Sequence, residues 1–447
     1  MFLLNKFLAF GLLIFYSPPT NAKQTPLQAC WNKQVKPLRE QCLSFSFTEN
    51  KNELEHSFQP WQQTNYFTQG TMWMGRYGFS KQDSLVSNGK TYFSKTYFTK
   101  EHLLFLDFGD KDLFPVTEDM LLDQPFTSCR YLPVVLINYF LEYNVLPDKE
   151  STEKITVYKT KINKTIVSLY IRQADKLLEK VTTLHHDDLF GDVISSFNYA
   201  DFSTAGKLHY PKHIYIDKIN GKIKDEVTLS GGVLTKEIPA LLNKPVDYKL
   251  QPAKVVKEDV RVEKYSNGIY FIELKHTDDK VMLVEFKDFL LVAEAPVNSG
   301  NGELIIREAK KMAPNKPIRY FVFGHYHPHY LGGLRAFVHK GAKLICSREN
   351  LEYVTYIAKA KHSLYPDSLQ LQPKPLQIEE IKDSLTIADG EQEMKIYFIG
   401  SKSAHTNDYL LYFFPKEKML FEDDLVWIKR AGPITKAGAR QAGLYTA

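Results

Sequence analysis

An apolar segment followed by three alternating histidines constrains this chain more than any other stretch. Residues Ile318–Phe323 are typical of a buried β-strand, and His325, His327 and His329 follow before a Gly-Gly pair. In an extended segment, side chains two residues apart point to the same side, so these imidazoles can converge on one point. Several imidazoles on one side suit a borderline cation such as zinc. The pattern predicts a metal site just beyond a buried strand.

The size and composition of the chain predict a globular protein of two or more domains. Its 447 residues are enough for that number of domains, and 26 Tyr and 29 Phe favour β-rich structure. The net charge of +5 comes without a dense run of Lys and Arg, which argues against a nucleic-acid partner. A small molecule of unknown identity is the expected substrate, and the sequence leaves the oligomeric state open.

The first 22 residues have the pattern of a signal peptide. Lys6 supplies the positive charge, Phe7–Tyr16 form an apolar core, and Ala22 offers a small residue for cleavage. Ten apolar residues are too few to span a bilayer, and no later stretch is long and apolar enough. We therefore expect a protein of the periplasm or the secreted fraction, without a stable membrane span.

Export would permit disulfides among the four cysteines. These cysteines allow three full pairings. Cys30 and Cys42 are expected to hold a short helix or loop within the polar residues 23–57. Cys346 lies in a strand-like segment and is expected to be a small buried hydrophobic residue.

The periodicity of the chain changes near residue 252, which predicts two domains after the signal peptide. Residues 23–252 read mainly as successive strands, with one helix in Tyr131–Tyr143. Proline and lysine mark a linker at Leu241–Val256. Residues 253–447 alternate between strands and helices, including an amphipathic helix at Gly302–Lys311. The predicted class is α+β, with a β-rich N-terminal domain before an α/β C-terminal domain.

One part of the N-terminal domain resembles another family loosely. Strand Asn198–Phe202, a turn of small residues, and a strand entered through Tyr210-Pro211 follow in order. This order resembles the curved antiparallel sheets of periplasmic lipoprotein-carrier proteins, and the resemblance supplies no catalytic residue. The nearby run His185–Asp188 is interpreted as a solvated turn between strands rather than as a metal site.

The C-terminal domain resembles the metallo-β-lactamase-fold superfamily in four motifs that follow in the expected order. His325-x-His327-x-His329, with Gly-Gly after it, resembles the family's His-x-His-x-Asp-His motif. Upstream, Glu294-Ala295-Pro296 occupies the place of its Asp-x-Pro turn. Downstream, Ala404-His405-Thr406 resembles its Gly-His-Thr motif, and Met419–Leu425 resembles its Phe-x-Gly-Asp segment.

The resemblance implies a four-layer αββα sandwich with zinc held by His325, His327 and His405. It places Asp424 at the family's metal-bridging aspartate, and Asp424 and His329 would complete or flank a second metal position and serve in catalysis. That second position is altered, because His329 and Tyr330 stand where the family has Asp and His. A phenol titrates near about 10 and rarely ligates at neutral pH. One zinc is therefore expected.

The end of the chain reads as the beginning of a helix, in residues 437–447. The family normally continues with that helix and a closing strand. We therefore expect the domain to lack its last helix and strand relative to other members.

These features together predict an exported zinc-dependent hydrolase of unknown substrate. In that hypothesis a metal-bound hydroxide attacks an ester, amide or similar bond. The alternative is a non-catalytic periplasmic protein that binds an apolar ligand or a partner on a degenerate scaffold. A third option is redox or sulfur chemistry with iron, which some members of the superfamily perform.

Overall fold

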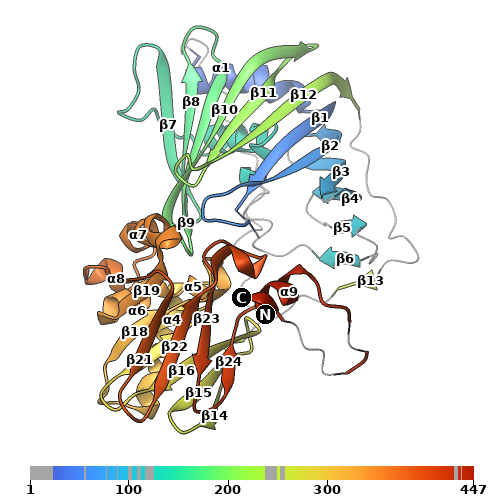
Figure 1. Ribbon diagram of the computed structural model, residues 1–447. Coiled ribbons are helices and arrows are strands. Elements are labelled where there is room, and N and C mark those ends of the chain that lie inside the picture. Colours follow the sequence, from blue (N-terminus) through green and yellow to red (C-terminus); the bar gives the residue numbers. More distant parts are fainter. Residues whose placement is uncertain are drawn as a thin grey trace.

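Figure 1 shows the computed structural model of the chain. The structure describes residues 24–54, 57–76, 78–87, 89–98, 103–107, 112–115, 125–236, 249–251, 257–426, 431–433 and 435–447. The predicted signal peptide, residues 1–22, lies outside the described residues. No described helix is long and apolar enough to cross a membrane.

One strongly curved sheet contains the first 13 strands of the described chain (Figure 1). They are β1 Cys42–Glu53, β2 Thr64–Met74, β3 Phe79–Ser87, β4 Lys90–Phe98, β5 Leu103–Asp107, β6 Asp112–Pro115, β7 Ile155–Ile162, β8 Thr165–Arg172, β9 Leu178–Asp187, β10 Gly191–Ala205, β11 Leu208–Lys218, β12 Ile223–Thr235 and β13 Lys249–Leu250. The strand order is β13-β6-β5-β4-β3-β2-β1-β12-β11-β10-β9-β8-β7. β13 joins β6 in parallel, and the neighbouring pairs from β6 to β7 are antiparallel.

Two helices pack against this sheet and close its apolar core. They are α1 Pro26–Gln34, which is followed by the short 3-10 helix Lys36–Leu38, and α3 Val134–Glu142. In α3 the buried side chains Leu136, Ile137 and Phe140 share one helical face. They join a core with residues of α1 and of the strands, so the helix predicted at 131–143 is confirmed and covers the sheet.

The expectations for residues 23–57 are partly wrong. A short helix is present, but Cys42–Glu53 form a 12-residue strand between β12 and β2. Cys30 and Cys42 do not form a disulfide: the Cys30 thiol lies 3.1 Å from Gln34 Oε1, and the Cys42 thiol lies 3.0 Å from Thr235 Oγ1. Each thiol thus has its own partner, Gln34 in the same helix for Cys30 and Thr235 on the neighbouring strand β12 for Cys42. Cys346 is fully buried, as predicted.

The C-terminal part contains two further sheets. The seven-stranded sheet contains, in order, β14 Val260–Ser266, β15 Ile269–Leu274, β16 Asp279–Glu285, β17 Leu290–Ala293, β18 Ile318–Val322, β19 Lys343–Ser347 and β20 Gln377–Ile381. The four-stranded antiparallel sheet contains β21 Ser384–Ala388, β22 Glu393–Phe398, β23 Leu410–Phe414 and β24 Met419–Phe421. The helices are α4 Ser299–Met312, α5 Pro328–Leu331, α6 Leu334–Lys340, α7 Leu351–Lys359, α8 Ser368–Leu371 and α9 Ala439–Thr446, with 3-10 turns at Arg348–Asn350 and Gly400–Ser403.

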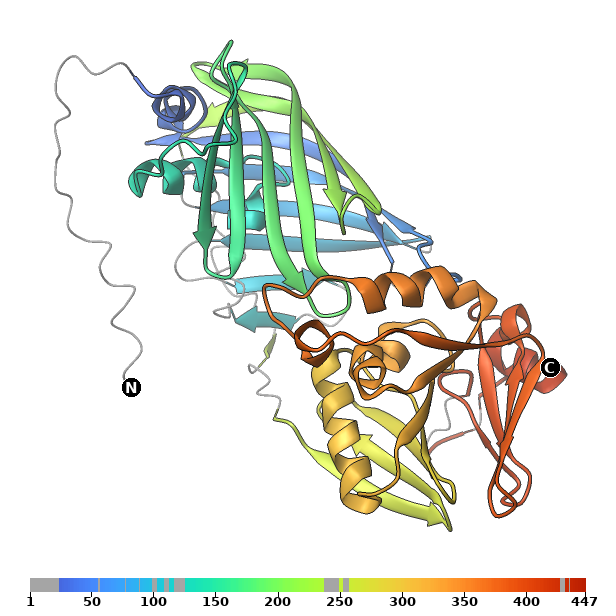
Figure 2. The same cartoon turned by 90° about the vertical axis from the view of Figure 1, so that its left-hand side faces the viewer.

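The two C-terminal sheets face each other across an apolar core, and helices lie outside them. Val284, Leu291 and Ile396 are among the buried residues between the sheets. A second core joins the other face of the seven-stranded sheet to α4, α6 and α7, and Figure 2 shows the yellow helix α4 on that side. On the outer side of the four-stranded sheet, α9 packs on the 400–403 turn. The α+β class is therefore confirmed, and residues 439–446 are helical as expected.

Helix α4 shows how the local sequence places these layers. The side chain of Asn298 accepts a hydrogen bond from Asn301 N at 3.0 Å, which starts the helix three residues before the predicted residue 302. Leu304, Ile305 and Ala309 are buried on the predicted face. The expected amphipathic helix is thus present and longer.

A buried ion pair between α6 and the start of α8 should be important for stability. Arg335, 2% exposed, binds both carboxylate oxygens of Asp367 at 2.6 and 3.0 Å. Burial alone would raise the pKa of Asp367, but the Arg335 hydrogen bonds lower that pKa to about 2. We expect Asp367→Ala to lower the free energy of unfolding by about 3–5 kcal/mol, because it leaves a buried guanidinium unpaired.

Urea unfolding followed by circular dichroism measures this loss. Because the folded pKa of Asp367 lies below its ordinary value of 3.8, its contribution is present above pH 4 and is lost as pH falls toward 2. The matched control is Asp259→Ala, which breaks an exposed pair with Lys275 and should cost less than about 1 kcal/mol. Equal losses in the two variants would contradict the prediction.

Candidate metal centre

Three histidines meet at the end of β18. One ring nitrogen from each of His325, His327 and His405 lies within 4.8 Å of the other two, and all three residues are buried. His325 Nε2 is 2.9 Å from His327 Nδ1 and 3.3 Å from His405 Nε2. The structure thus brings together three of the five predicted site residues around one point.

Gly324 lets an acidic residue approach the first of these histidines. A Cβ atom on Gly324 would stand 1.9 Å from Asp423 Oδ2, a distance that no side chain could accept. The same Asp423 oxygen lies 3.0 Å from His325 Nδ1. Glycine at 324 therefore allows a buried carboxyl group to orient the His325 ring from behind.

The Gly-Gly pair after the histidines likewise allows two segments to approach closely. A Cβ atom on Gly332 would stand 2.3 Å from the backbone of Val297, and one on Gly333 would stand 2.8 Å from Ala295 Cβ. Gly333 N also donates to the Ala295 carbonyl at 2.8 Å. The pair therefore seats the histidine loop directly on the turn that follows β17.

His329 does not join the group of three, and the reason lies in the backbone. His327 is extended, with φ −64° and ψ 148°, but Pro328 begins helix α5. The alternation that holds for 325 and 327 therefore ends, and His329 Nδ1 lies 3.2 Å from Asp279 Oδ1. That hydrogen bond raises the pKa of His329. Its predicted roles in ligation and catalysis stay predictions.

His405 reaches the site from a tight turn before β23. Ala404 has a left-handed backbone with φ 52°, and Ser403 Oγ accepts from His405 N at 3.1 Å and donates to the Thr406 carbonyl at 2.9 Å. Leu410 N then donates to the Gly324 carbonyl at 2.7 Å. The start of β23 is thereby tied to the loop that holds the other two histidines.

Asp424 borders the three histidines, as the sequence predicts. Its Oδ2 lies 3.2 Å from His405 Nε2 and 3.3 Å from Arg440 Nη1, and its Oδ1 lies 4.0 Å from His325 Nε2. Its backbone N–H donates to Tyr409 Oη at 3.1 Å. Burial alone would raise the pKa of Asp424, but His405 and Arg440 outweigh it and lower that pKa. Asp424 is therefore a carboxylate at neutral pH.

The surroundings of His325 keep its ring neutral. Burial lowers the pKa of His325 well below its ordinary value, and His327 and His405 lower it further. Neutral imidazole is the form that binds a metal ion. Tyr330, which packs on the His325 ring at 4.2 Å, has a raised pKa because of burial and nearby acids. Its side chain therefore remains a neutral phenol that packs on the His325 ring.

A pair of buried carboxyl groups lies behind the histidines. Glu294 and Asp423 hydrogen-bond to each other, and Tyr412 Oη donates to Glu294 Oε1 at 2.9 Å. Burial raises the pKa of Glu294 to about 8, and burial together with the Glu294 charge raises that of Asp423. The pair therefore holds a proton near neutral pH, which lets two acids share one apolar space.

The hydrogen-bond partner of His327 indicates that the three histidines can hold a cation. Its Nε2 lies 3.2 Å from the carbonyl oxygen of Ser57, which can only accept a hydrogen bond. Nε2 must then carry the hydrogen, and Nδ1 of the neutral ring presents a lone pair toward His325 and His405. Three nitrogen donors are a set that zinc prefers.

Several residues of this site were missed or undervalued from the sequence. In the sequence Asp423 is simply a second acid beside Asp424, although its place next to a predicted ligand is a usable signal. Tyr409 directly precedes β23, and nothing in the sequence indicates that its hydroxyl accepts two backbone N–H groups. Ser57 acts through its carbonyl, for which no side-chain pattern exists.

The run His185–Asp188 is only in part the turn that was predicted. β9 continues to Asp187, so both histidines lie in the strand. The His186 side chain packs against His362 at 5.4 Å and against Tyr365 at 5.0 Å between ring centroids. It contacts the C-terminal part of the chain and is not a simple solvated residue.

Comparison with known proteins gives matches among solved structures alone. No protein-family pattern and no curated protein matches the chain. A metallo-beta-lactamase from Pontibacter korlensis is 20% identical, with a TM-score of 0.30, over 39% of this chain and 75% of that one. The DIM-1 metallo-beta-lactamase is 17% identical, with a TM-score of 0.29, over 39% of this chain and 73% of that one. A flavoprotein from Thermotoga maritima is 14% identical, with a TM-score of 0.28, over 38% of this chain and 42% of that one.

The hydroxyl of Tyr409 should matter for metal affinity. In Tyr409→Phe, the N–H groups of Asp423 and Asp424 lose their acceptor, and both carboxyl groups beside the histidines are held less firmly. We expect zinc to bind about tenfold more weakly, as measured by competition with a chromophoric chelator.

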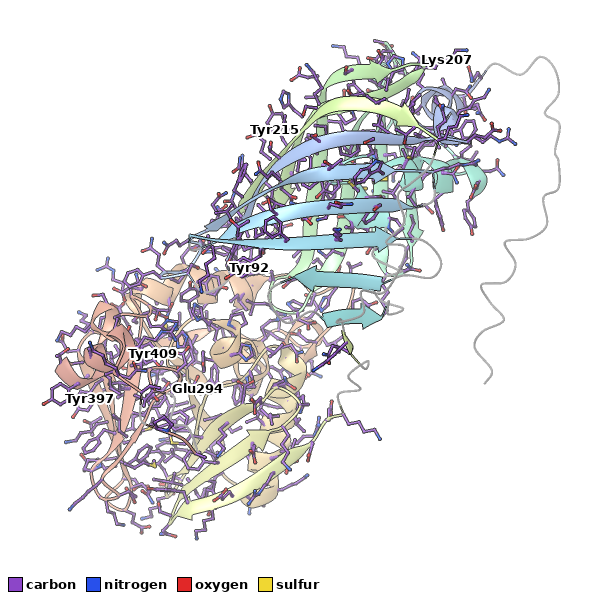
Figure 3. The ribbon with its side chains drawn as sticks, turned by 90° about the vertical axis from the view of Figure 1, so that its right-hand side faces the viewer. Tyr92, Lys207, Tyr215, Glu294, Tyr397 and Tyr409 are labelled. Atoms are coloured by element: carbon purple, nitrogen blue, oxygen red, sulfur yellow. The ribbon has the colours of Figure 1, made fainter. Side chains whose placement is uncertain are left out.

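Tyr397→Phe is the matched control. Tyr397 lies at the edge of the C-terminal part, whereas Tyr409 and Glu294 lie inside it near Asp423 (Figure 3). The Tyr397 variant should bind zinc as the unaltered chain does. Wild-type affinity in Tyr409→Phe would show that its hydroxyl does not support the site.

Proposed function

We propose that this protein is a zinc-dependent hydrolase whose ion is held by His325, His327 and His405. The observation that supports this proposal is the convergence of three buried imidazole nitrogens within 4.8 Å of one another. A nitrogen-only set favours zinc over magnesium or calcium, which prefer oxygen ligands. Three protein ligands also leave the open position that catalytic zinc sites keep.

Residues beside the ion would accept a proton from the bound water and orient the acceptor. When bound, zinc supplies Lewis acidity, which lowers the pKa of a water and polarises a carbonyl group. Asp424 Oδ1 has no hydrogen-bond partner among the described residues and can accept a proton from that water. Arg440 holds the other oxygen of the same carboxylate at 3.3 Å and fixes its direction. A small molecule with an ester, amide or similar bond is the proposed substrate.

The 13-stranded sheet β1–β13, here called the front sheet, argues against the alternative of a carrier of apolar ligands. A protein that carries an apolar ligand needs an apolar cavity, but the described cavity on the face of strands β1–β4 has about 750 Å³ and many charged groups. Six charged side chains line it: Glu49, Lys51, Glu53, Lys81, Asp83 and Arg130. This lining favours a polar occupant or solvent. Export remains part of the proposal on the strength of residues 1–22.

Metal analysis of the purified chain tests the proposal first. We expect about one zinc per chain by elemental mass spectrometry, and little or none in His325→Ala, His327→Ala or His405→Ala. His213→Ala is the control, because His213 pairs with Asp201 in the front sheet. Iron in place of zinc would favour redox chemistry, and a chain that takes up no zinc when supplied with it would refute the proposal.

Asp424→Asn separates catalysis from metal binding. The amide keeps the shape of the side chain but is a far weaker proton acceptor. We expect zinc content to remain near that of the unaltered chain while kcat/KM for a responsive chromogenic ester falls by about 100-fold or more. Asp278→Asn, an exposed change, should leave both values unchanged. Full activity in Asp424→Asn would exclude Asp424 from the proton transfer.

A further inference from the structure

The connection between β1 and β2 of the front sheet reaches the three histidines. Within it, residues 57–62, here called the 57–62 segment, contact both halves of the metal centre. The Ser57 carbonyl accepts a hydrogen bond from Tyr326 Oη at 2.6 Å and lies 3.2 Å from His327 Nε2. The Phe58 carbonyl accepts from Asn407 N at 2.9 Å, two residues after His405. Backbone groups of the front sheet therefore border the site.

His327 depends on this segment for its outer hydrogen bond. His325 is oriented by Asp423, which belongs to the C-terminal part, whereas the partner of His327 Nε2 is the carbonyl of Ser57. Metal-binding histidines are generally fixed by an acceptor on the nitrogen that does not bind the ion, and loss of such a partner weakens metal binding by about 10–100-fold. One of these acceptors is thus supplied from outside the C-terminal domain.

Trp61 anchors the segment between the two parts of the chain. Its ring stacks on Phe190 of the front sheet at 5.4 Å, and meets Tyr353 and Tyr356 of α7 edge-on at 5.0 Å each. Lys222 Nζ lies 4.5 Å from the ring centroid, and Trp61 Nε1 donates to Glu352. The ring therefore bridges strands of the front sheet to a helix of the C-terminal part.

The backbone conformation of Trp61 also indicates that contacts on both sides hold this residue in place. Its φ of 63° lies in the left-handed region, which a bulky side chain rarely adopts. Such a conformation persists where surrounding contacts hold it, and it is frequent at functional sites. The contacts of the indole ring supply that restraint here.

The surrounding core is continuous between the two parts. Leu189 and Phe190, from the turn between β9 and β10, and Val193 of β10 belong to the same buried cluster as Tyr353 and Val354 of α7. Figure 2 shows the ends of the green and blue strands meeting the orange helices at this level. The 57–62 segment is therefore held in a packed junction.

We propose that the 57–62 segment is a positioning element of the metal centre. The Ser57 carbonyl fixes the ring of His327, and Trp61 fixes the segment, so that metal affinity depends on how the front sheet meets the C-terminal part. This inference rests on the proposed metal site and adds that the site is incomplete without the front sheet.

The test compares zinc affinity and the cobalt(II) absorption spectrum in full-length variants. Trp61→Ala should bind zinc about 10–100-fold more weakly and should alter the cobalt spectrum, since His327 loses its fixed direction. Trp61→Phe, which keeps an aromatic ring in the junction, should restore most of the affinity. A purely structural role for Trp61 would change stability but leave the cobalt spectrum as it is.

Asp192→Ala is the matched control, because it weakens the same junction at a point away from the histidines. Asp192 accepts hydrogen bonds from Ser363 N at 2.8 Å and from Leu364 N at 3.1 Å, and neither residue touches the site. Zinc affinity and the cobalt spectrum of this variant should match those of the unaltered chain. An equal loss in Asp192→Ala would overturn the inference, since any loosening of the junction would then suffice.

Two further results separate a failure of this inference from a failure of the proposed metal site. If the unaltered chain binds zinc and Trp61→Ala binds it equally well with the same spectrum, the inference is wrong while the proposed metal site stands. If Trp61→Ala does not fold, Tyr326→Phe takes its place, because it removes only the hydroxyl that donates to the Ser57 carbonyl. Unchanged affinity in that variant would overturn the inference, and a chain without zinc binding would overturn it together with the proposed function.

Discussion

The close approach of three buried imidazoles is the constraint on which the C-terminal part depends. His327 must carry its hydrogen on the nitrogen that faces the Ser57 carbonyl, so its other nitrogen turns a lone pair inward. Burial opposes protonation of His325, so a proton cannot readily take the place of a cation. Inward-facing imidazole nitrogens held this close together are a donor set that a metal ion such as zinc can bind.

Burial and nearby charges also set the protonation of the acids around the histidines. Asp423 and Glu294 are too buried to be ionised together, and they share a proton through a direct hydrogen bond. Asp424 is different because Arg440 and His405 stabilise its charge. Two neighbouring aspartates thus have opposite tendencies, and only the second is suited to accept a proton from a bound water.

Much of this site could be predicted because it depends on side chains in a local pattern. His325 and His327 follow a buried strand at alternate positions, and His405 and Asp424 lie at the ends of later strands, where motif order identifies them. His329 fits the same alternation but does not join the group, because Pro328 begins a helix and ends the extended backbone. A pattern of period two holds only as long as the backbone remains extended.

The rest could not be predicted, because backbone groups and long-range packing carry no side-chain signature. β1 was missed because its apolar residues are followed by a polar half, yet pairing with β2 and β12 makes it a central strand. Cys30 and Cys42 are near in sequence, but the Cys30 thiol contacts Gln34 of its own helix, whereas the Cys42 thiol contacts Thr235 of β12. For β1 and for Cys42, contacts with distant segments decided the local structure.

The contact at Ser57 shows why the two parts of this chain need to be considered together. Every residue type offers a backbone carbonyl, so a change in the Ser57 side chain does not by itself remove the acceptor on His327. What matters is where the backbone runs, and that depends on Trp61 and on the strands at either end of the connection. We therefore expect residues that place the segment, such as Trp61, to affect the ring of His327 more than the Ser57 side chain does. Through this connection the front sheet borders the candidate metal centre.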